Sequence, residues 1–399
     1  MSDLTRTNDS MIPFNANQDK VDQTLGKGPM LMKTRTLFSK GCNPGEIQTT
    51  HLEAVRDLLG KQRELQDPKD LDRSFSQLHL SYRGGRVTAQ TLSQAGLDPE
   101  VMLVHENAYS QMSSNVFPAR FGSGLLQQAA LGDTGEKLST MSWALWSQTN
   151  QTPRMLRTVR TRDMDGQVRR IIRSQHSQGY AVYDNFQFVQ DLLDNAPELA
   201  GMPVLDFRVT DTGMRLRFST DGTEKIELRQ PIPIIEAWNS EVGRRRTVLN
   251  GGIFKLICTN GMKSWDNKTE FAWRHFGDTS RISEGVASAI TELQTSASGV
   301  VDAYNSALDV AIDDAFSFME RELKREGLTQ DQIGKAQKAL DHDWTTPGGG
   351  LASVIDATTL IAQDYDMFVQ SDIERAAARV LRRGQAEALR TGGRIRVDA

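Results

Sequence analysis

The most regular feature of the 399-residue sequence is an apolar repeat between residues 283 and 326. Apolar side chains recur at steps of three or four residues, and ten steps from Val286 to Leu323 cover 37 residues. A step of about 3.7 residues stays close to the helical period, so these side chains lie on one helix face. We therefore expect one continuous helix over 283–326, roughly 55 Å long, which packs against a sheet or another chain. The stripe consists of Val286, Ile290, Leu293, Ala297, Val301, Tyr304, Leu308, Ile312, Phe316, Met319 and Leu323.

The middle of the chain carries the shorter period of strands. Residues 204–210 and 213–220 alternate apolar and polar side chains, and the short glycine-containing connection between them predicts a hairpin. A further strand pattern over 225–238 contains Pro231 and Pro233, which we expect at a sheet edge or a bend. The sequence predicts an α+β fold: a central, mostly antiparallel sheet with flanking helices, a helical N-terminal part and long C-terminal helices.

Composition shifts and turn signals divide the chain into five expected segments. In the second segment, apolar residues at helical spacing predict a helix over 51–66. Short helices and turns are expected over 86–130, with Thr88 as a helix N-cap. The segments are a polar N-terminal arm (1–50), a helical N-terminal region (51–153), a central α+β domain with a basic face (154–278), a long helix with a helical hairpin (279–345), and a C-terminal helix with a tail (346–399).

Composition excludes several classes of protein. Hydrophobic residues make up 38% and charged residues 25% of the chain, which is ordinary for a soluble globular protein and excludes a disordered chain, a collagen-like repeat or a disulfide scaffold. Cys42 and Cys258 lie far apart and form no zinc-binding spacing. No apolar run is long enough to span a membrane, and the polar start does not resemble a signal peptide. We expect a cytoplasmic protein that binds no membrane, cofactor or metal.

The net charge of −4 hides a basic centre. Residues 1–153 carry a net charge of −1, residues 154–275 carry +4 and residues 276–399 carry −7. Seven arginines face only two aspartates between 154 and 173, and the planar guanidinium suits bidentate contact with phosphate. The alternative is strand-surface charge paired to nearby acids. The expected nucleic-acid contacts are Arg154, Arg157, Arg160, Arg162, Arg169, Arg170, Arg173, Arg244, Arg245 and Arg246, with Trp238 and Trp265 stacking on bases; core packing is the alternative for these tryptophans.

Catalytic motifs are sparse. The chain has no phosphate-binding loop, no nucleophile elbow and no zinc-protease helix motif. Cys258 would need a base to act as a nucleophile, and His275 is the only histidine within twenty residues of it. We expect Asp341–Asp343 to be solvent-exposed residues at the end of a helix rather than metal ligands. The sequence therefore favours a non-enzymatic protein.

Two elements resemble a family of phage- and plasmid-related proteins, catalogued as domain of unknown function nine-three-two. One is Asn239-Ser240-Glu241-Val242-Gly243 followed by the run 252–262, which ends in Cys-Thr-Asn-Gly-Met. The other joins 168–174 to Tyr180-x-x-Tyr183-Asp184-Asn185, although Ile-Ile-Arg-Ser at 171–174 and His176 depart from the family pattern. The match spans roughly 85–385. It implies a phage, prophage or plasmid protein, whose outline is similar to the Redβ, RecT and Erf class of single-strand annealing proteins.

Together these features predict a protein of a phage or mobile element that binds single-stranded nucleic acid, with DNA the expected form, in recombination or annealing. We expect a homo-oligomer in the cytoplasm, which is the host's if a phage encodes the chain. One alternative is a structural or oligomeric interaction protein without nucleic-acid binding, and another is an enzyme of unrecognised type. A basic groove favours binding, and a pocket with converging carboxylates beside His176 or His275 favours catalysis. Arginines paired internally favour the interaction protein.

Overall fold

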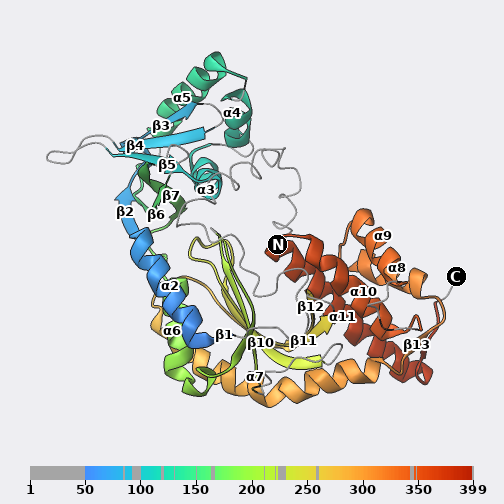
Figure 1. The fold of residues 1–399 in the computed structure, drawn as a ribbon. Helices are drawn as coiled ribbons and strands as arrows, with labels where there is room; N and C mark the ends of the chain where they lie inside the picture. Colours follow the sequence, from blue (N-terminus) through green and yellow to red (C-terminus); the bar gives the residue numbers. More distant parts are fainter. Residues whose placement is uncertain are drawn as a thin grey trace.

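The computed structural model confirms the α+β fold class, with mostly antiparallel sheets, flanking helices and a helical C-terminal part (Figure 1). None of the described helices is both long and apolar enough to cross a membrane. The polar arm over 1–50 lies outside the described residues except for Thr50. The structure describes residues 50–83, 86–91, 100–117, 121–129, 131–149, 151–162, 167–210, 212–220, 222, 231–257, 260–341, 346 and 348–397.

Within the described residues, the N-terminal sheet has six strands in the order β2-β6-β7-β5-β4-β3. Its neighbouring strands pair antiparallel, except for the parallel pair β5 and β7. Because β6 and β7 belong to this sheet, strand pairing crosses the expected boundary at residue 153. Helices between residues 106 and 147 cover the sheet around a core that includes Phe75, Met112 and Trp143. The elements are β2 (Lys69–Arg73), β3 (Leu78–Arg83), β4 (Arg86–Thr91), β5 (Val101–Val104), β6 (Arg154–Arg162), β7 (Val168–His176), α3 (Glu106–Val116), α4 (Phe121–Ala129) and α5 (Asp133–Ser147).

The prediction of short helices over 86–130 is wrong in its first part. Residues 86–91 and 101–104 are strands, so Thr88 lies inside β4 and caps no helix. The β4 segment is rich in β-branched residues, which fit a pleated surface, and pairing on both sides with β3 and β5 overrides a weak helical pattern. Among the described residues of this stretch, the first helix begins at residue 106.

In the part of the chain that the structure describes, the central sheet also has six strands, in the order β1-β8-β9-β10-β11-β12, and every neighbouring pair is antiparallel. The predicted hairpin is confirmed, since β8 and β9 pair up to Val209 and Met214. Pro231 and Pro233 start an interior strand, but β9 pairs with β10 only from Ile234 onward. The prolines thus lie where no second neighbour needs their missing N–H. The strands are β1 (Thr50–His51), β8 (Pro203–Val209), β9 (Met214–Ser219), β10 (Pro231–Asn239), β11 (Thr247–Ile257) and β12 (Asn260–Trp273).

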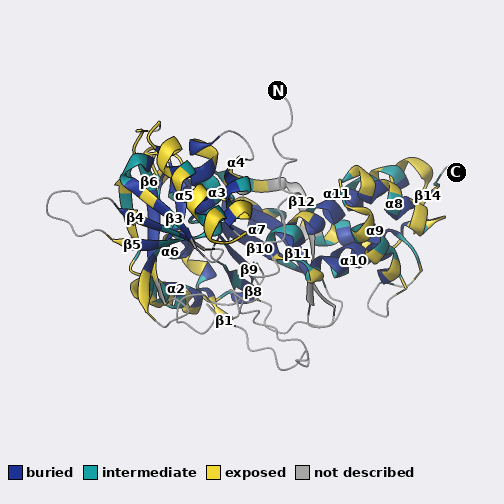
Figure 2. Ribbon diagram, turned by 90° about the horizontal axis from the view of Figure 1, so that it is seen from above, coloured by how far each residue is buried: buried dark blue, intermediate teal, exposed yellow. Residues whose placement is uncertain are grey.

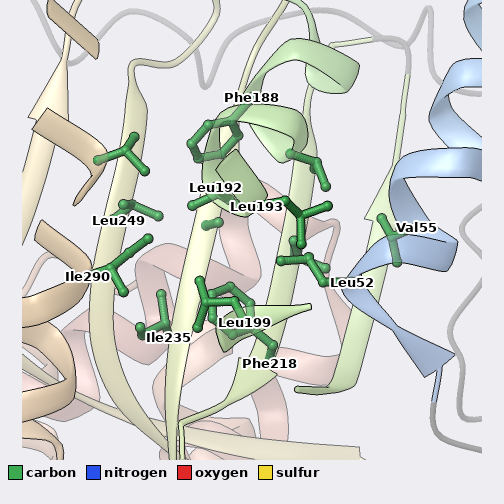
Figure 3. Close-up of a cluster of buried hydrophobic side chains, with 14 of the residues drawn as sticks. Leu52, Val55, Phe188, Leu192, Leu193, Leu199, Phe218, Ile235, Leu249 and Ile290 are labelled. Carbon is green, nitrogen blue, oxygen red and sulfur yellow. The ribbon is translucent and has the colours of Figure 1, made fainter. Parts of the chain in front are cut away.

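One face of the central sheet packs against three helices: α2 (Leu52–Gln66), α6 (Asn185–Asn195) and α7 (Ser280–Ala307). Figure 3 shows side chains of these helices, among them Leu52, Phe188 and Ile290, meeting Ile235 and Leu249 of the strands. The predicted helix over 51–66 is confirmed as α2. Its buried positions follow the apolar spacing in the sequence.

The single helix expected over 283–326 is wrong, because the chain breaks between Leu308 and Asp314. Residues 311–312 form a short parallel pair with the C-terminal end of the chain, and Asp314 caps the next helix by accepting from the Ser317 amide. The apolar period survives the break because both helices pack into buried clusters, which a periodicity argument cannot separate from one helix. The C-terminal elements are β13 (Ala311–Ile312), α8 (Ala315–Arg325), α9 (Gln330–Ala339), α10 (Leu351–Ile361), α11 (Met367–Thr391) and β14 (Arg394–Ile395).

Aspartate substitutions along this stripe are expected to differ sharply. Leu293 is fully buried, so Leu293→Asp places an unpaired charge in the core and costs several kcal/mol. Leu308 is 50% exposed at the end of α7, so Leu308→Asp leaves the charge in water and changes stability by no more than about 0.5 kcal/mol. Urea denaturation of both variants measures the difference, and equal losses would contradict the broken helix.

Candidate functional site at the junction of the two sheets

The arginines of 154–173 do not form one phosphate track. Arg157 is 8% exposed, and its guanidinium lies 3.1 Å from Asp70 Oδ1 and 2.7 Å from Asp184 Oδ1. It also donates to the backbone carbonyl of Glu241 at 3.1 Å. Because these acceptors surround it, the side chain links the N-terminal sheet to the start of α6 and to the β10–β11 turn. Arg157 therefore fits the alternative of internal pairing.

Two further arginines are held in the same way. Arg170 is 7% exposed and lies between Asp67 at 3.1 Å and Glu100 at 3.4 Å. Arg173 is 11% exposed and lies 2.8 Å from Glu241 Oε2. In this structure neither offers its guanidinium to solvent, so the expectation of phosphate contact at these residues is not supported by their surroundings.

The other arginines of this stretch have different environments. Arg160 is 56% exposed and pairs with Asp67 at 3.1 Å. Arg169 is exposed, and Arg154 is partly buried. Strand β6 includes Arg162, but its side chain lies outside the described residues. The register places Arg160 and Arg169 toward the hairpin end of β6 and β7.

Aromatic rings stack where the two sheets meet. Tyr180 stacks against His176, with ring centroids 3.7 Å apart, and against His275, with centroids 5.3 Å apart, and the ring planes of both pairs are 11° apart. His176 ends β7, whereas His275 follows β12. We call these three rings, together with the surrounding polar side chains Arg157, Arg173, Ser174, Asp184, Asn239, Ser240, Glu241 and Thr247, the junction cluster.

Hydrogen bonds fix the protonation of His275. Thr247 Oγ1 donates to Asn239 Oδ1 at 2.8 Å and lies 3.0 Å from His275 Nε2. Since the hydroxyl has one proton, His275 Nε2 carries the hydrogen and donates to Thr247. His275 Nδ1 lies 3.0 Å from the Tyr180 hydroxyl, which also lies 3.3 Å from the backbone carbonyl oxygen of Glu241. Both imidazole nitrogens are thereby occupied.

Glu241 supplies the negative charge of the cluster. Its Oε2 pairs with Arg173, and its Oε1 accepts from the backbone amide of Asn185 at 2.9 Å, in the first turn of α6. Burial disfavours the charged form, but Arg173, Arg157 and the Asn185 amide outweigh burial and hold the pKa of Glu241 below its usual value. A carboxylate at a helix N-terminus is also favoured by the helix dipole. Glu241 therefore joins the turn after β10 to α6 and β7.

Gly243 makes the close approach possible. Its φ of +67° lies in the left-handed region, which favours glycine. A Cβ atom there would lie 2.8 Å from His176 Cε1 and 3.3 Å from the Tyr180 ring. The structure thus brings the Asn239–Gly243 step against Tyr180, and into contact with Tyr183 and Asn185 through Asn239 Nδ2. These are the two sequence elements that carried the family resemblance.

The cluster contains acid–base groups, but their burial opposes catalysis. Ser174 Oγ lies 2.8 Å from His176 Nε2, the arrangement of a nucleophile and its base. Ser174 is fully buried, and burial lowers the pKa of His176 to about 3, far from the value a general base needs near neutral pH. Cys258 lies outside the described residues. No group of three His, Cys, Asp or Glu side chains among the described residues can hold a metal ion.

Stability is expected to fall as the pH decreases from about 6.5 to about 3. Burial lowers the pKa of His176 to about 3 and of His275 to about 4, against 6.5 for an ordinary histidine. The unfolded chain therefore takes up these protons at higher pH than the folded chain does, so the stabilisation is fully present above pH 6.5 and is lost through this window. His275 alone contributes about 3 kcal/mol, since one pKa unit corresponds to about 1.4 kcal/mol.

Urea denaturation at a series of pH values measures this dependence. His275→Gln removes one titrating group and should flatten the curve between pH 6.5 and pH 4. His79→Gln is the matched control, because His79 is exposed on β3. A control variant that flattens the curve as much as His275→Gln would contradict the assignment.

The structure corrects the expectation for Trp238. Trp238 is fully buried on β10, beneath the guanidinium of Arg245 at 4.6 Å and against Phe368 of α11. Its ring therefore cannot stack on a base in this conformation. Arg245 is also engaged, since it lies 2.8 Å from Asp372. The Trp265 side chain lies outside the described residues.

A buried charge network that the sequence analysis missed lies under α11. Arg217 is 2% exposed and contacts Glu236 at 2.7 Å, Glu374 at 3.0 Å and Asp206 at 3.4 Å. Arg215, fully buried, lies 2.7 Å from Asp206. Because strand alternation normally places such charges in water, only a sheet covered on both faces accounts for them. No sequence signal marked this burial, because Asp206, Arg215 and Arg217 alternate with apolar residues as the charges of a half-exposed strand do.

A second arginine group reaches the surface beside the junction cluster. Arg244 and Arg246 are exposed in the turn between β10 and β11, and Arg274 is exposed directly after β12. Phe276, two residues further on, is 73% exposed, and its backbone forms an isolated antiparallel β-bridge with Tyr180. The last residue pair of the β11–β12 ladder is Thr247 and Trp273, so Arg246 and Arg274 flank that pair on the two strands. We call Arg244, Arg246, Arg274 and Phe276 the strand-end patch.

Comparison with known proteins found no matching family model, no matching curated protein and no matching solved structure.

Proposed function

We propose that this chain binds single-stranded nucleic acid through the strand-end patch and catalyses no reaction. The observation that carries the proposal is the position of Arg246 and Arg274 beside the last pair of the β11–β12 ladder, with both side chains exposed. Among the described residues, neither has a carboxylate partner within salt-bridge distance. Like charges at facing positions of a ladder repel each other, and a phosphate bound between them would remove that cost.

The remaining members of the patch, Arg244 and Phe276, add a further positive charge and an aromatic ring, the two features of a single-strand binding site. Arg244 supplies a third exposed guanidinium, which lies 5.1 Å from the Phe368 ring. Phe276 offers a largely exposed aromatic ring, and single-strand binders combine cationic grooves with aromatic rings on which bases stack. Asp278 is close in sequence, but its carboxylate is engaged by the Ser280 hydroxyl at 2.7 Å.

The family resemblance adds a biological setting to this proposal. The resembling elements meet in the junction cluster, directly beside the patch. On that basis we propose a phage- or plasmid-encoded protein that acts on single-stranded DNA in recombination or annealing, in the cytoplasm of the host cell.

The runner-up is an interaction protein that binds no nucleic acid. The internal pairing of Arg157, Arg170 and Arg173 favours it, because these side chains hold the junction together rather than face solvent. The two proposals differ in what they expect of the exposed arginines: the runner-up gives them no ligand.

A binding panel tests the proposal. Fluorescence anisotropy would follow labelled oligothymidine, oligoadenosine, a matched DNA duplex and oligouridine at two salt concentrations. We expect single strands to bind more tightly than the duplex and binding to weaken as salt rises, because bound arginines release counterions from phosphates. If no strand shows salt-sensitive binding, the proposal fails and the interaction protein becomes the leading function.

A further inference from the structure

Helix α5 exposes large apolar side chains to solvent, which an ordinary surface helix buries. Its buried side carries Ser139, Trp143 and Ser147, with Ser139 Oγ donating to the Leu125 carbonyl at 2.8 Å. The side facing solvent carries leucine and methionine, whereas a surface helix normally turns its apolar stripe to the core. The exposed fractions are 49% for Leu138, 68% for Met141 and 71% for Leu145.

The apolar surface continues onto neighbouring residues. Phe121 at the start of α4 is 43% exposed and packs on Trp146, with ring centroids 6.1 Å apart. Leu131 between the two helices is 85% exposed. Of the thirteen large hydrophobic side chains exposed in the described residues, six lie between 121 and 146. We call these six the α4–α5 face: Phe121, Leu131, Leu138, Met141, Leu145 and Trp146; Figure 2 shows exposed residues along this helical layer.

A concentration of this kind marks an interaction surface. Monomeric soluble proteins rarely expose contiguous apolar patches, and such patches are typical of protein interfaces. Interface centres are rich in aromatic residues and methionine and poor in charge. The α4–α5 face matches this composition, since it contains Phe121, Met141 and Trp146 and no charged residue.

We propose that the α4–α5 face binds the same face of a second copy of this chain, about a twofold axis that sets the two α5 helices antiparallel. The charged residues of α5 are Asp133, Glu136 and Lys137, all in its first five positions, and none follows until Arg154. A twofold contact places each residue type opposite itself or its neighbours. When the two α5 helices cross along their uncharged parts, no like charges come together. The dipoles of two antiparallel helices also attract each other.

The charge of α5 argues against a membrane as the occupant. Helices that lie on anionic lipid carry lysine and arginine along their polar side. Here the single lysine pairs with Asp133 at 2.7 Å, and Glu136 leaves the helix net acidic. A charged peptide would also find no ion-pair partner within the face. An uncharged apolar face can meet its own copy without bringing like charges together, so it fits a second copy of the chain, and this inference is independent of the proposed nucleic-acid contact.

Sedimentation of the protein without nucleic acid tests the proposal. Wild type should shift with concentration from the 44.4 kDa monomer toward twice that mass. Met141→Glu combined with Leu145→Glu should sediment as a monomer at every concentration, because the charges of two copies would face each other. Leu389→Glu is the matched control: this leucine of α11 is 87% exposed and should leave the dimer intact.

Circular dichroism and thermal melting would check that each variant is folded. We expect all of them to fold, because the replaced side chains are exposed. A wild-type protein that stays at 44.4 kDa throughout would overturn the proposal. The same holds if the double variant dimerises as wild type does, or if the Leu389 control abolishes the dimer equally.

Discussion

Replacing Glu241 by alanine is expected to lower the free energy of unfolding by about 3–5 kcal/mol, the cost of breaking one partner of a buried ion pair. Arg173, 11% exposed, would lose the carboxylate 2.8 Å away, and the Asn185 amide would lose its acceptor at the start of α6. Arg157 would keep Asp70 and Asp184, so the loss should concentrate at the contact between β7 and α6. Urea denaturation measures the total, and hydrogen exchange of the first turn of α6 measures its location.

Lys137→Ala provides the matched control for Glu241→Ala. Lys137 and Asp133 also form an ion pair at 2.7 Å, but both side chains are more than 70% exposed. Exposed pairs contribute little because water and salt screen them, so we expect no measurable loss. Equal effects of the two substitutions would show that the junction cluster is solvated rather than buried.

Arg217→Ala is expected to have the largest effect of any single substitution proposed for this chain, at least about 3–5 kcal/mol. It leaves Glu236 and Glu374, both fully buried, without the guanidinium that lies between them. Trp238 donates its indole N–H to Glu236, so tryptophan fluorescence should report the change directly. The packing of helix α11 against the central sheet should weaken first, because Glu374 of α11 is the residue that contacts Arg217.

A double variant separates the buried charge from the lost packing. Arg217→Met with Glu374→Leu removes one stranded carboxylate together with the arginine and should be more stable than Arg217→Ala, because apolar replacement of a buried ion pair is often tolerated. Measured together with the single variants Arg217→Met and Glu374→Leu, it completes a double-mutant cycle that gives the coupling between the two sites. A double variant as unstable as Arg217→Ala would indicate that the charges contribute less than the packing.

The sequence predicted the fold where local patterns and tertiary packing agree. The α2 helix and the β8–β9 hairpin follow their periods because each buries one apolar face. The apolar repeat over 283–326 predicted one helix instead of α7 and α8 for the same reason. Two helices that both pack into buried clusters keep one period across the break between them. The strands β4 and β5 were missed because their short segments show a weak helical pattern, which pairing with β3, with each other and with the distant β7 overrides.

The candidate site could be predicted only in part. The resemblance pointed to Tyr180–Asn185 and Asn239–Gly243, and the structure places both in the junction cluster. Arginine density, by contrast, does not tell paired from free side chains: Arg157 and Arg246 look alike in sequence, but one is surrounded by acids and the other is exposed. Arg274 was not expected at all, because only the strand register brings it beside Arg246. Phe276, two residues after Arg274, was not expected either; it forms a backbone β-bridge with Tyr180.

The salt dependence of single-strand binding tests the proposed function most directly. Arg246→Ala with Arg274→Ala removes two positive charges from the strand-end patch, and Arg160→Ala with Arg169→Ala removes two from the far end of β6 and β7. If both patch arginines contact phosphate, the first pair should reduce the slope of log K against log salt by about 1.4, at about 0.7 per contact. The second pair should leave the slope unchanged. Equal slopes for wild type and the folded patch variant, or a reduction only in the second pair, would contradict the proposal.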